Sequence, residues 1–423
     1  MEEIIEVKGR EILDSRGNPT LEVEVTTISG FKGFAQVPSG ASKGKFEAVE
    51  LRDEDERYFG KGVQKAIRNI ELLIAPEILG LDVLNQEEVD RRMISLDGTK
   101  NKGKIGANAI LGVSLAVARA ASNFLGIPLY KYIGGLFADT LPVPFLNIIN
   151  GGKHAENNLD IQEFLIAPIG FKNFRDAIRA GAEVYMKLKE ILKKEGLITG
   201  IGDEGGFSPN LKNNEKAIKL IFKAIEEAKY KPGEEIFIAL DCAASSFFKD
   251  GKYIFEEKEI DGSDLIEYYL KLIEKYPIIS IEDPFDEEDY SSWKIFTKEV
   301  GNKIQIIGDD IFVTNKEKFL FGIENGIANS ILIKLNQIGT LTETIEVINI
   351  ARKYGYNYMI SHRSGETTDT FIADFSVATR SYQIKSGAPA RGERVAKYNR
   401  LIAIEEELEG KSRYGSEFLK IKR

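Results

Sequence analysis

The sequence predicts an α/β protein with two domains: a small N-terminal α+β domain over residues 1–135 and a closed α/β barrel over residues 140–423. Three observations predict this fold. Apolar and polar residues alternate near the N-terminus. Beyond residue 145, short apolar runs are each followed by an amphipathic helix, and polar residues end those runs at regular spacing. A length of 423 residues exceeds one compact core and allows two domains.

The N-terminal domain begins with an antiparallel meander over residues 3–38. In LEVEVTT apolar and acidic residues alternate as in a half-buried strand, and the turn-forming SRGNP and SG segments separate the runs. Helical patterns follow at about 61–74, 86–96 and 106–125, after which two prolines mark a boundary. The first domain is therefore predicted to combine an antiparallel meander with helices.

Two helices of the second domain carry clear capping signals. In SDLIEYYLKLIEKYP we expect Asp264 to cap the helix, with Glu267 three residues on. In GTLTETIEVINIARKYG, Thr340 and Glu343 form a capping box and Gly355 stands at the C′ position. Each helix is followed directly by an apolar run, so both belong to repeating βα units.

A polar residue follows each of five apolar runs in the second domain. The runs IFIAL, IISI, IQIIG, SILI and YNYMIS lead to Asp241, Glu282, Asp309, Lys334 and His362, at spacings of 41, 27, 25 and 28 residues. The last three spacings each fit one βα unit. Because the carboxyl ends of parallel barrel strands meet at one face, these side chains are expected to converge at one mouth.

Asp241, Glu282 and Asp309 would repel one another at such a mouth unless a cation neutralised them. An all-oxygen ligand set suits Mg²⁺ or Mn²⁺ better than zinc. Taken singly, each carboxylate could instead be a helix cap or an ion-pair partner. Their joint position at the ends of neighbouring strands favours a metal site.

Lys334 and Glu204 are the candidate base and acid. Lys334 ends a buried run, and a neighbouring divalent metal would lower its pKa toward that of a useful base; alternatively it reaches to the barrel rim. Glu204 lies in the glycine-rich turn IGDEGGF, which can aim a carboxyl group into a cleft or be a plain turn.

The chain has only two histidines, His154 in NGGKHAENN and His362 in SHRSGET, both in predicted loops at strand ends. An isolated histidine can be structural, but Arg363 and Ser364 offer a guanidinium fork and a hydroxyl group suited to phosphate. Lys385, which ends the run SYQIK, adds another contact for an anion. The SGASKG segment at 39–44 lacks Walker spacing; it is a flexible loop or a mobile lid that contributes oxygens to a metal.

Taken together, these motifs resemble those of the enolase family over nearly the full length of the chain. The matching segments are DSRGNPT, SGASKG, NGGKHA, QEF, GDEGG, LDCA, SIEDPF, GDD, SILIKLNQIG, SHRSGET and QIK. The resemblance implies an eightfold α/β (TIM-like, enolase-type) barrel whose first units run ββαα rather than βα. It also implies a phosphopyruvate hydratase, a carbon–oxygen lyase of glycolysis and gluconeogenesis that interconverts 2-phosphoglycerate and phosphoenolpyruvate.

The resemblance also implies a role for each site residue. Lys334 would be the general base, Glu204 the general acid, and Glu163 would support Glu204. Two Mg²⁺ ions are implied, one held by Asp241, Glu282 and Asp309 and the second, arriving with substrate, by Ser42. The residues that would hold or surround the substrate are His154, Gln162, Glu163, Lys334, His362, Arg363, Ser364 and Lys385. Gln162 and Glu163 are neighbours, so they can share a site only if their strand ends or twists there.

Composition excludes several other classes of protein. A net charge of −9 argues against nucleic-acid binding, and the one cysteine, Cys242, is expected to be a small buried hydrophobe in a reducing compartment. The N-terminus lacks the pattern of a signal peptide, and the apolar segment at 105–130 is interrupted by polar residues, so we expect a cytoplasmic protein without a membrane span. The resemblance implies a homo-oligomer, a dimer or an octamer. The alternatives are a racemase or cycloisomerase of the same superfamily and a surface-displayed or secreted binding protein.

Overall fold

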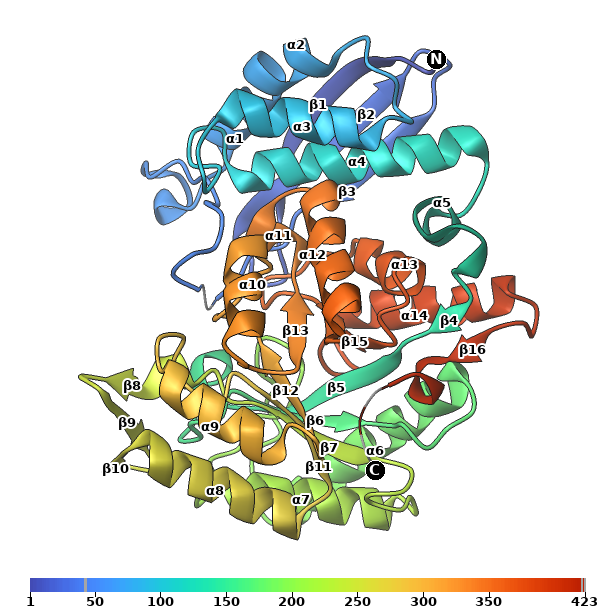
Figure 1. Cartoon of the computed structure of the whole chain (residues 1–423). Coiled ribbons are helices and arrows are strands. Elements are labelled where there is room, and N and C mark those ends of the chain that lie inside the picture. Colours follow the sequence, from blue (N-terminus) through green and yellow to red (C-terminus); the bar gives the residue numbers. More distant parts are fainter. Residues whose placement is uncertain (42–43, 420, 422–423) are drawn as a thin grey trace.

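The computed structural model describes residues 1–41, 44–419 and 421. A small N-terminal domain lies against one end of a larger barrel domain, as the blue and cyan elements at the top of Figure 1 show. The predicted fold class is confirmed: an antiparallel meander with helices precedes a closed eight-stranded barrel.

The N-terminal sheet has the order β1-β2-β3 and is antiparallel throughout. Its strands are β1 (Ile4–Leu13), β2 (Pro19–Thr27) and β3 (Lys32–Gln36). The helices that follow are α1 (Gln64–Asn69), the π-helical turn η2 (Ile70–Ile74), α2 (Ala75–Ile78), α3 (Gln86–Asp97), α4 (Ala107–Leu125) and α5 (Leu129–Gly134). All three helical patterns predicted for this domain therefore form helices close to the expected bounds.

Helix α4 packs closely on this sheet because small residues face each other. A Cβ atom added at Gly33 of β3 would lie 2.0 Å from the carbonyl oxygen of Ala116 and 2.3 Å from the amide nitrogen of Ala120, so the two backbones touch. Among the described helices, α4 alone is long and apolar enough to cross a membrane, and 78% of its most apolar window is buried inside the structure. It is a core helix, as its polar interruptions predicted.

The barrel closes in the order β11-β12-β13-β14-β15-β5-β6-β7. Its strands are β5 (Val143–Asn150), β6 (Glu163–Ala167), β7 (Phe237–Asp241), β11 (Ile278–Glu282), β12 (Gln305–Gly308), β13 (Ser330–Ile333), β14 (Asn357–Ser361) and β15 (Gln383–Lys385). Neighbours pair in parallel except β6, which is antiparallel to both β5 and β7. Two helices follow β6, so the barrel begins ββαα as expected.

Helices surround this barrel (Figure 1). They are α6 (Phe174–Lys194), α7 (Asn214–Glu227), α8 (Gly262–Lys275), α9 (Tyr290–Val300), α10 (Lys316–Glu324), α12 (Leu341–Tyr354), α13 (Phe371–Ala378) and α14 (Gly392–Glu407), with a short α11 (Leu335–Ile338) after β13. Minor strands are β4 (Thr140–Leu141), β16 (Arg413–Tyr414) and the β8 (Phe248–Lys249), β9 (Lys252–Phe255), β10 (Lys258–Ile260) sheet.

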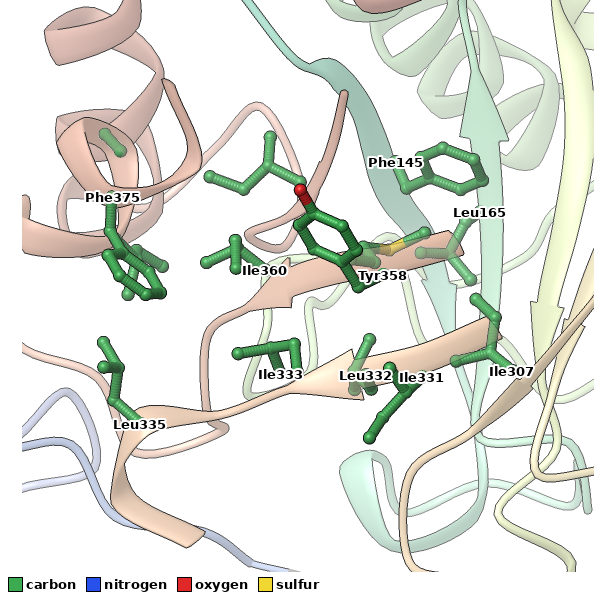
Figure 2. Packing of buried hydrophobic residues seen from close by; sticks show 14 of the residues in the cluster. Phe145, Leu165, Ile307, Ile331, Leu332, Ile333, Leu335, Tyr358, Ile360 and Phe375 are labelled. Carbon is green, nitrogen blue, oxygen red and sulfur yellow. The ribbon is translucent and has the colours of Figure 1, made fainter. Parts of the chain in front are cut away.

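The barrel strands are apolar on both faces because helices cover their outer side. Figure 2 shows Ile331, Leu332 and Ile333 of β13 beside Tyr358 and Ile360 of β14, with Phe375 of α13 at one end of this cluster. All of these side chains are buried, which explains why the strands read as continuous apolar runs rather than as alternating ones.

One of the two predicted helix caps is confirmed and the other is wrong. Thr340 caps α12, accepting a hydrogen bond from the Glu343 amide, and Gly355 ends the helix with φ +75°. Helix α8, however, begins at Gly262, with Asp261 as its cap and Asp264 completing the capping box. The Asp261 carboxylate accepts a hydrogen bond from the backbone amide of Asp264. The helix therefore starts about one turn earlier than the apolar stripe suggested.

Polar contacts hold the N-terminal domain over the mouth of the barrel. Arg119 of α4 forms a two-pronged ion pair with Asp369 of the barrel, at 2.6 Å for each nitrogen–oxygen pair. Ser39, at the start of the SGASKG segment, forms a β-bridge with Gly365 in the loop after β14. The segment is thereby fixed at its first residue beside the barrel mouth.

Candidate active site

The residues predicted at the strand ends meet in one buried cavity at the mouth of the barrel. Its lining residues are His154, Gln162, Glu163, Glu204, Asp241, Lys334, Ser361, His362, Arg363, Ser364 and Lys385. Glu282 and Asp309 contact two of these residues directly. Ser42, the predicted ligand of a second metal, lies outside the described residues.

The position of Gln162 and Glu163 follows from the direction of β6. Because β6 runs antiparallel to its neighbours, its first residue, Glu163, lies at the mouth where the parallel strands have their last residues. Glu163 pairs with Asp241, the last residue of β7, and Gln162 directly precedes the strand. Both neighbours therefore line the cavity, because the strand begins between them.

Lys385 lies at the centre of a set of buried carboxylates. Its Nζ is 2.8 Å from Oδ2 of Asp241, 2.9 Å from Oε1 of Glu282 and 3.2 Å from Oε1 of Glu163. Burial alone would lower the pKa of Lys385, but Asp241, Glu163 and Glu282 hold that pKa well above its usual value. The ammonium group is therefore charged, and its ion pairs with three carboxylates hold it at the mouth.

Lys334 forms an ion pair with Asp309, and the amide of Gln337 donates a second hydrogen bond to the same carboxylate at 2.9 Å. Burial lowers the pKa of Lys334, but Asp309 outweighs burial, so the pKa is raised above its ordinary value. This direction is opposite to the lowering expected from the sequence. The expectation assumed a cation beside the lysine, whereas here the nearest charge is a carboxylate.

The acidic groups at this mouth outnumber the cations that neutralise them. Burial and then Asp241 raise the pKa of Glu282 well above its usual range. Burial and then Asp309 raise the pKa of Asp310 to about 8. Ligand atoms of Asp283, Asp309 and Asp310 all lie within 4.8 Å of one another. Burial and neighbouring charge thus favour the neutral forms of Glu282 and Asp310. A hard divalent cation beside these oxygen donors would remove the repulsion.

Glu204 and the two histidines form a second group of buried side chains, which Glu163 joins to Lys385. Oε1 of Glu204 is 3.6 Å from Nδ1 of His154, which is also 3.5 Å from Oε1 of Glu163. Oε2 of Glu204 accepts a hydrogen bond from Nδ2 of Asn147 at 3.0 Å. Burial and then the charge of Glu204 raise the pKa of Glu163 well above its usual value. Burial also acts to raise the pKa of Glu204, but His362 and His154 outweigh it and hold that pKa well below its usual value, so the proton of the pair lies on Glu163.

His362 is the second histidine that faces Glu204. Its Nε2 lies 3.3 Å from Oε2 of Glu204, and its Nδ1 lies 2.6 Å from Nη1 of Arg394. Burial lowers the pKa of His362 to about 4, against the opposing charge of Glu204 and with the help of Arg394. At neutral pH the His362 ring is therefore uncharged.

Arg363 and Ser364 lie at the side of the cavity next to the SGASKG segment. The Arg363 guanidinium forms a two-pronged ion pair with Glu47, at 3.0 and 3.1 Å. The Ser364 hydroxyl accepts a hydrogen bond from the amide of Ala41 at 2.6 Å. The predicted phosphate-binding side chains therefore connect the barrel to the N-terminal segment.

Sequence reasoning missed three side chains that hold the site together. Gln337 orients Asp309, Asn147 donates to Glu204, and Arg394 contacts His362. The signal for Gln337 was present, because it follows Lys334 within the motif SILIKLNQIG. Asn147 lies inside an apolar strand, and Arg394 lies on a helix rather than at a strand end, so the spacing rule could find neither.

Comparison with known families covers nearly the whole chain. Residues 4–133 match the family model described as "Enolase, N-terminal domain", and residues 138–422 match the one described as "Enolase, C-terminal TIM barrel domain".

Proposed function

Because the chain belongs to the enolase family, we propose that it is a phosphopyruvate hydratase that reversibly removes water from 2-phosphoglycerate to give phosphoenolpyruvate. The observation that carries this proposal is that Lys334 and Glu204 line one cavity but have different charged or titratable partners, Asp309 for Lys334 and the two histidines for Glu204. A dehydration needs such a pair, because one group must take a proton from carbon and another must give a proton to the leaving hydroxyl group.

The first half of the reaction removes the proton next to the substrate carboxylate, and we assign this step to Lys334. The resulting carbanion spreads its charge onto the carboxylate oxygens, and water stabilises such a dianion poorly. Lys385 is fixed and charged at the mouth, so it offers a preorganised positive group to these oxygens. That enolase-type sites pair a lysine base with Mg²⁺ is a general property of such enzymes.

The carboxylates of Asp241, Glu282 and Asp309 are the proposed ligands of a first Mg²⁺, and Ser42 is the proposed ligand of a second. When bound, these ions would supply positive charge against the carboxylates of the protein and of the substrate. Asp309 would then no longer hold the proton on Lys334, so the lysine could act as a base. The raised pKa of Lys334 in the structure is therefore specific to its pairing with Asp309.

The second half of the reaction expels hydroxide, and we assign the proton donor to Glu204. In the structure the proton of this pair lies on Glu163, so Glu204 would receive it from Glu163 before it protonates the leaving oxygen. Both carboxyl groups are buried, which keeps bulk water from competing for that proton. Acid and base thus act at separate positions of one cavity.

The rival within the same superfamily is a racemase or cycloisomerase that acts on a carboxylate without phosphate. Arg363 and Ser364 weigh against it, because a buried guanidinium and a hydroxyl group beside the cavity suit a phosphate group. These residues set the substrate class that we propose.

A substrate panel tests this choice. We expect turnover of 2-phosphoglycerate with Mg²⁺ and no measurable turnover of glycerate or lactate, since these acids leave the buried Arg363 without an anion partner from the substrate. Absorbance measures phosphoenolpyruvate, and proton NMR follows the acids that lack phosphate. Efficient racemisation or elimination of an acid without phosphate, with 2-phosphoglycerate inert, would replace this proposal by the rival.

A further inference from the structure

One guanidinium group, that of Arg394 on α14, connects the loop after β14 with the turn that carries Glu204. Arg394 is fully buried, at 0% exposure. It donates to the carbonyl oxygens of Arg363 and Ser364, each at 2.6 Å, and to that of Asp203 at 3.1 Å. Its Nη1 is also 2.6 Å from Nδ1 of His362. Arg394 therefore contacts both the loop that carries His362 and the turn that carries Glu204.

The contact with His362 determines which ring nitrogen carries the proton. A guanidinium group has only donors, so Nδ1 of His362 must accept and must present its lone pair to Arg394. A neutral imidazole with an unprotonated Nδ1 carries its proton on Nε2. The burial and low pKa of His362 agree with a neutral ring. The tautomer thus follows from the donor chemistry of the partner.

The Nε2–H of His362 faces Glu204. Oε2 of Glu204 lies 3.3 Å from this nitrogen and already accepts a hydrogen bond from Asn147 at 3.0 Å. An oxygen that faces two donors is a poor place for a carboxylic proton. When Glu204 carries the proton that it donates, this proton therefore belongs on Oε1, the oxygen that faces His154.

We propose that Arg394 is a positioning residue for the acid half of the reaction: through His362 it keeps Oε2 of Glu204 an acceptor and directs the transferable proton to Oε1. This inference rests on the proposed function, because it concerns Glu204, the acid that the proposed dehydration needs. Arg394 acts through His362 and the loop carbonyls and touches no reacting atom itself.

The tautomer can be measured in the unmodified protein. Because the chain has only two histidines, ¹⁵N labelling of histidine gives two sets of ring signals, and a His154→Gln variant assigns them. We expect His362 at neutral pH to show a protonated Nε2 and an unprotonated Nδ1. A protonated Nδ1 in the native protein would overturn the proposal, and this measurement needs no variant of Arg394.

A matched pair of variants tests whether Arg394 is the cause. Lys397 lies one turn further along α14, is also fully buried, and donates to Oε2 of Glu366 at 2.8 Å without contacting His362. Arg394→Met should allow the Nδ1–H tautomer and lower product formation at least about tenfold, the usual scale for losing an outer hydrogen-bond partner. Exchange of the α-hydrogen with solvent should fall much less. Lys397→Met should keep both the native tautomer and the native ratio of product formation to exchange.

The outcomes separate this proposal from the proposed function. If the unmodified protein fails to dehydrate 2-phosphoglycerate, the proposed function fails while the ring signals still report whether Arg394 sets the tautomer. If dehydration is normal but Arg394→Met keeps the Nε2–H tautomer and the native ratio, the positioning role is wrong. If Lys397→Met lost the Nε2–H tautomer of His362 to the same extent, Arg394 would only support the fold in general, and the proposal would also be overturned.

Discussion

Replacing Lys334 by alanine should abolish turnover of 2-phosphoglycerate, by at least the roughly 10²- to 10⁴-fold that a positioned acid or base contributes. Lys334 follows β13 directly, is buried, and lines the same cavity as Glu204. The loss should be in kcat, because the alanine variant keeps the side chains proposed to hold the phosphate and the carboxylate. Steady-state formation of phosphoenolpyruvate measures this effect.

Two controls separate loss of the base from loss of the site. Lys303→Ala changes an exposed lysine before β12, at the far end of the strand that leads to Asp309, and should keep native activity. In Lys334→Ala, Asp309 loses its lysine partner, so calorimetry should show that Mg²⁺ still binds, with affinity at least equal to native. Activity of Lys334→Ala near the native level would show that another group removes the proton.

Chelation of divalent metal should reduce activity to background, at least about 10³-fold, and added Mg²⁺ should restore it. Metal ions at such sites contribute several kcal/mol of charge stabilisation. The structure gives a further reason, because burial and then the charge of Asp241 raise the pKa of Glu282, and a cation would relieve both effects. Activity after dialysis against chelator and after back-titration with Mg²⁺ is the measurement.

The metal prediction has its own control and its own contrary result. Glu282→Gln should weaken Mg²⁺ binding in a calorimetric titration, and its circular dichroism spectrum should match that of the native protein. Full turnover in excess chelator would show that catalysis needs no metal. The carboxylates would then be an ion-pair network around the two lysines.

The strand-end residues could be predicted from sequence because the barrel repeats. Asp241, Glu282, Asp309 and Lys334 each end or directly follow an apolar run, and a parallel barrel brings such positions to one mouth. The position of Glu163 could not be settled in this way. Its strand is antiparallel, which no local pattern in the QEF segment reveals, and only the closed order of strands shows why both Gln162 and Glu163 reach the cavity.

Charge at the site was harder to predict than position. The pKa of Lys334 depends on whether Asp309 pairs with it or with a cation. The sequence names both residues but does not show that they are in contact. The contact of Arg394 with His362 joins a helix and a loop 32 residues apart, and nothing in the helix marks that residue as different from its neighbours. Such second contacts are set by tertiary packing and become visible only in the structure.

Exchange of the α-hydrogen of 2-phosphoglycerate in deuterated water tests the central claim most directly, because it reports proton removal alone, whereas phosphoenolpyruvate formation needs both halves of the reaction. With Mg²⁺ present, we predict that Lys334→Ala loses exchange and product together. Glu204→Gln should lose product yet retain measurable exchange, because Lys334 and Lys385 are unchanged in that variant. If Lys334→Ala continued to exchange while Glu204→Gln did not, the roles of base and acid would be reversed and the assignment of Lys334 as the base would be wrong.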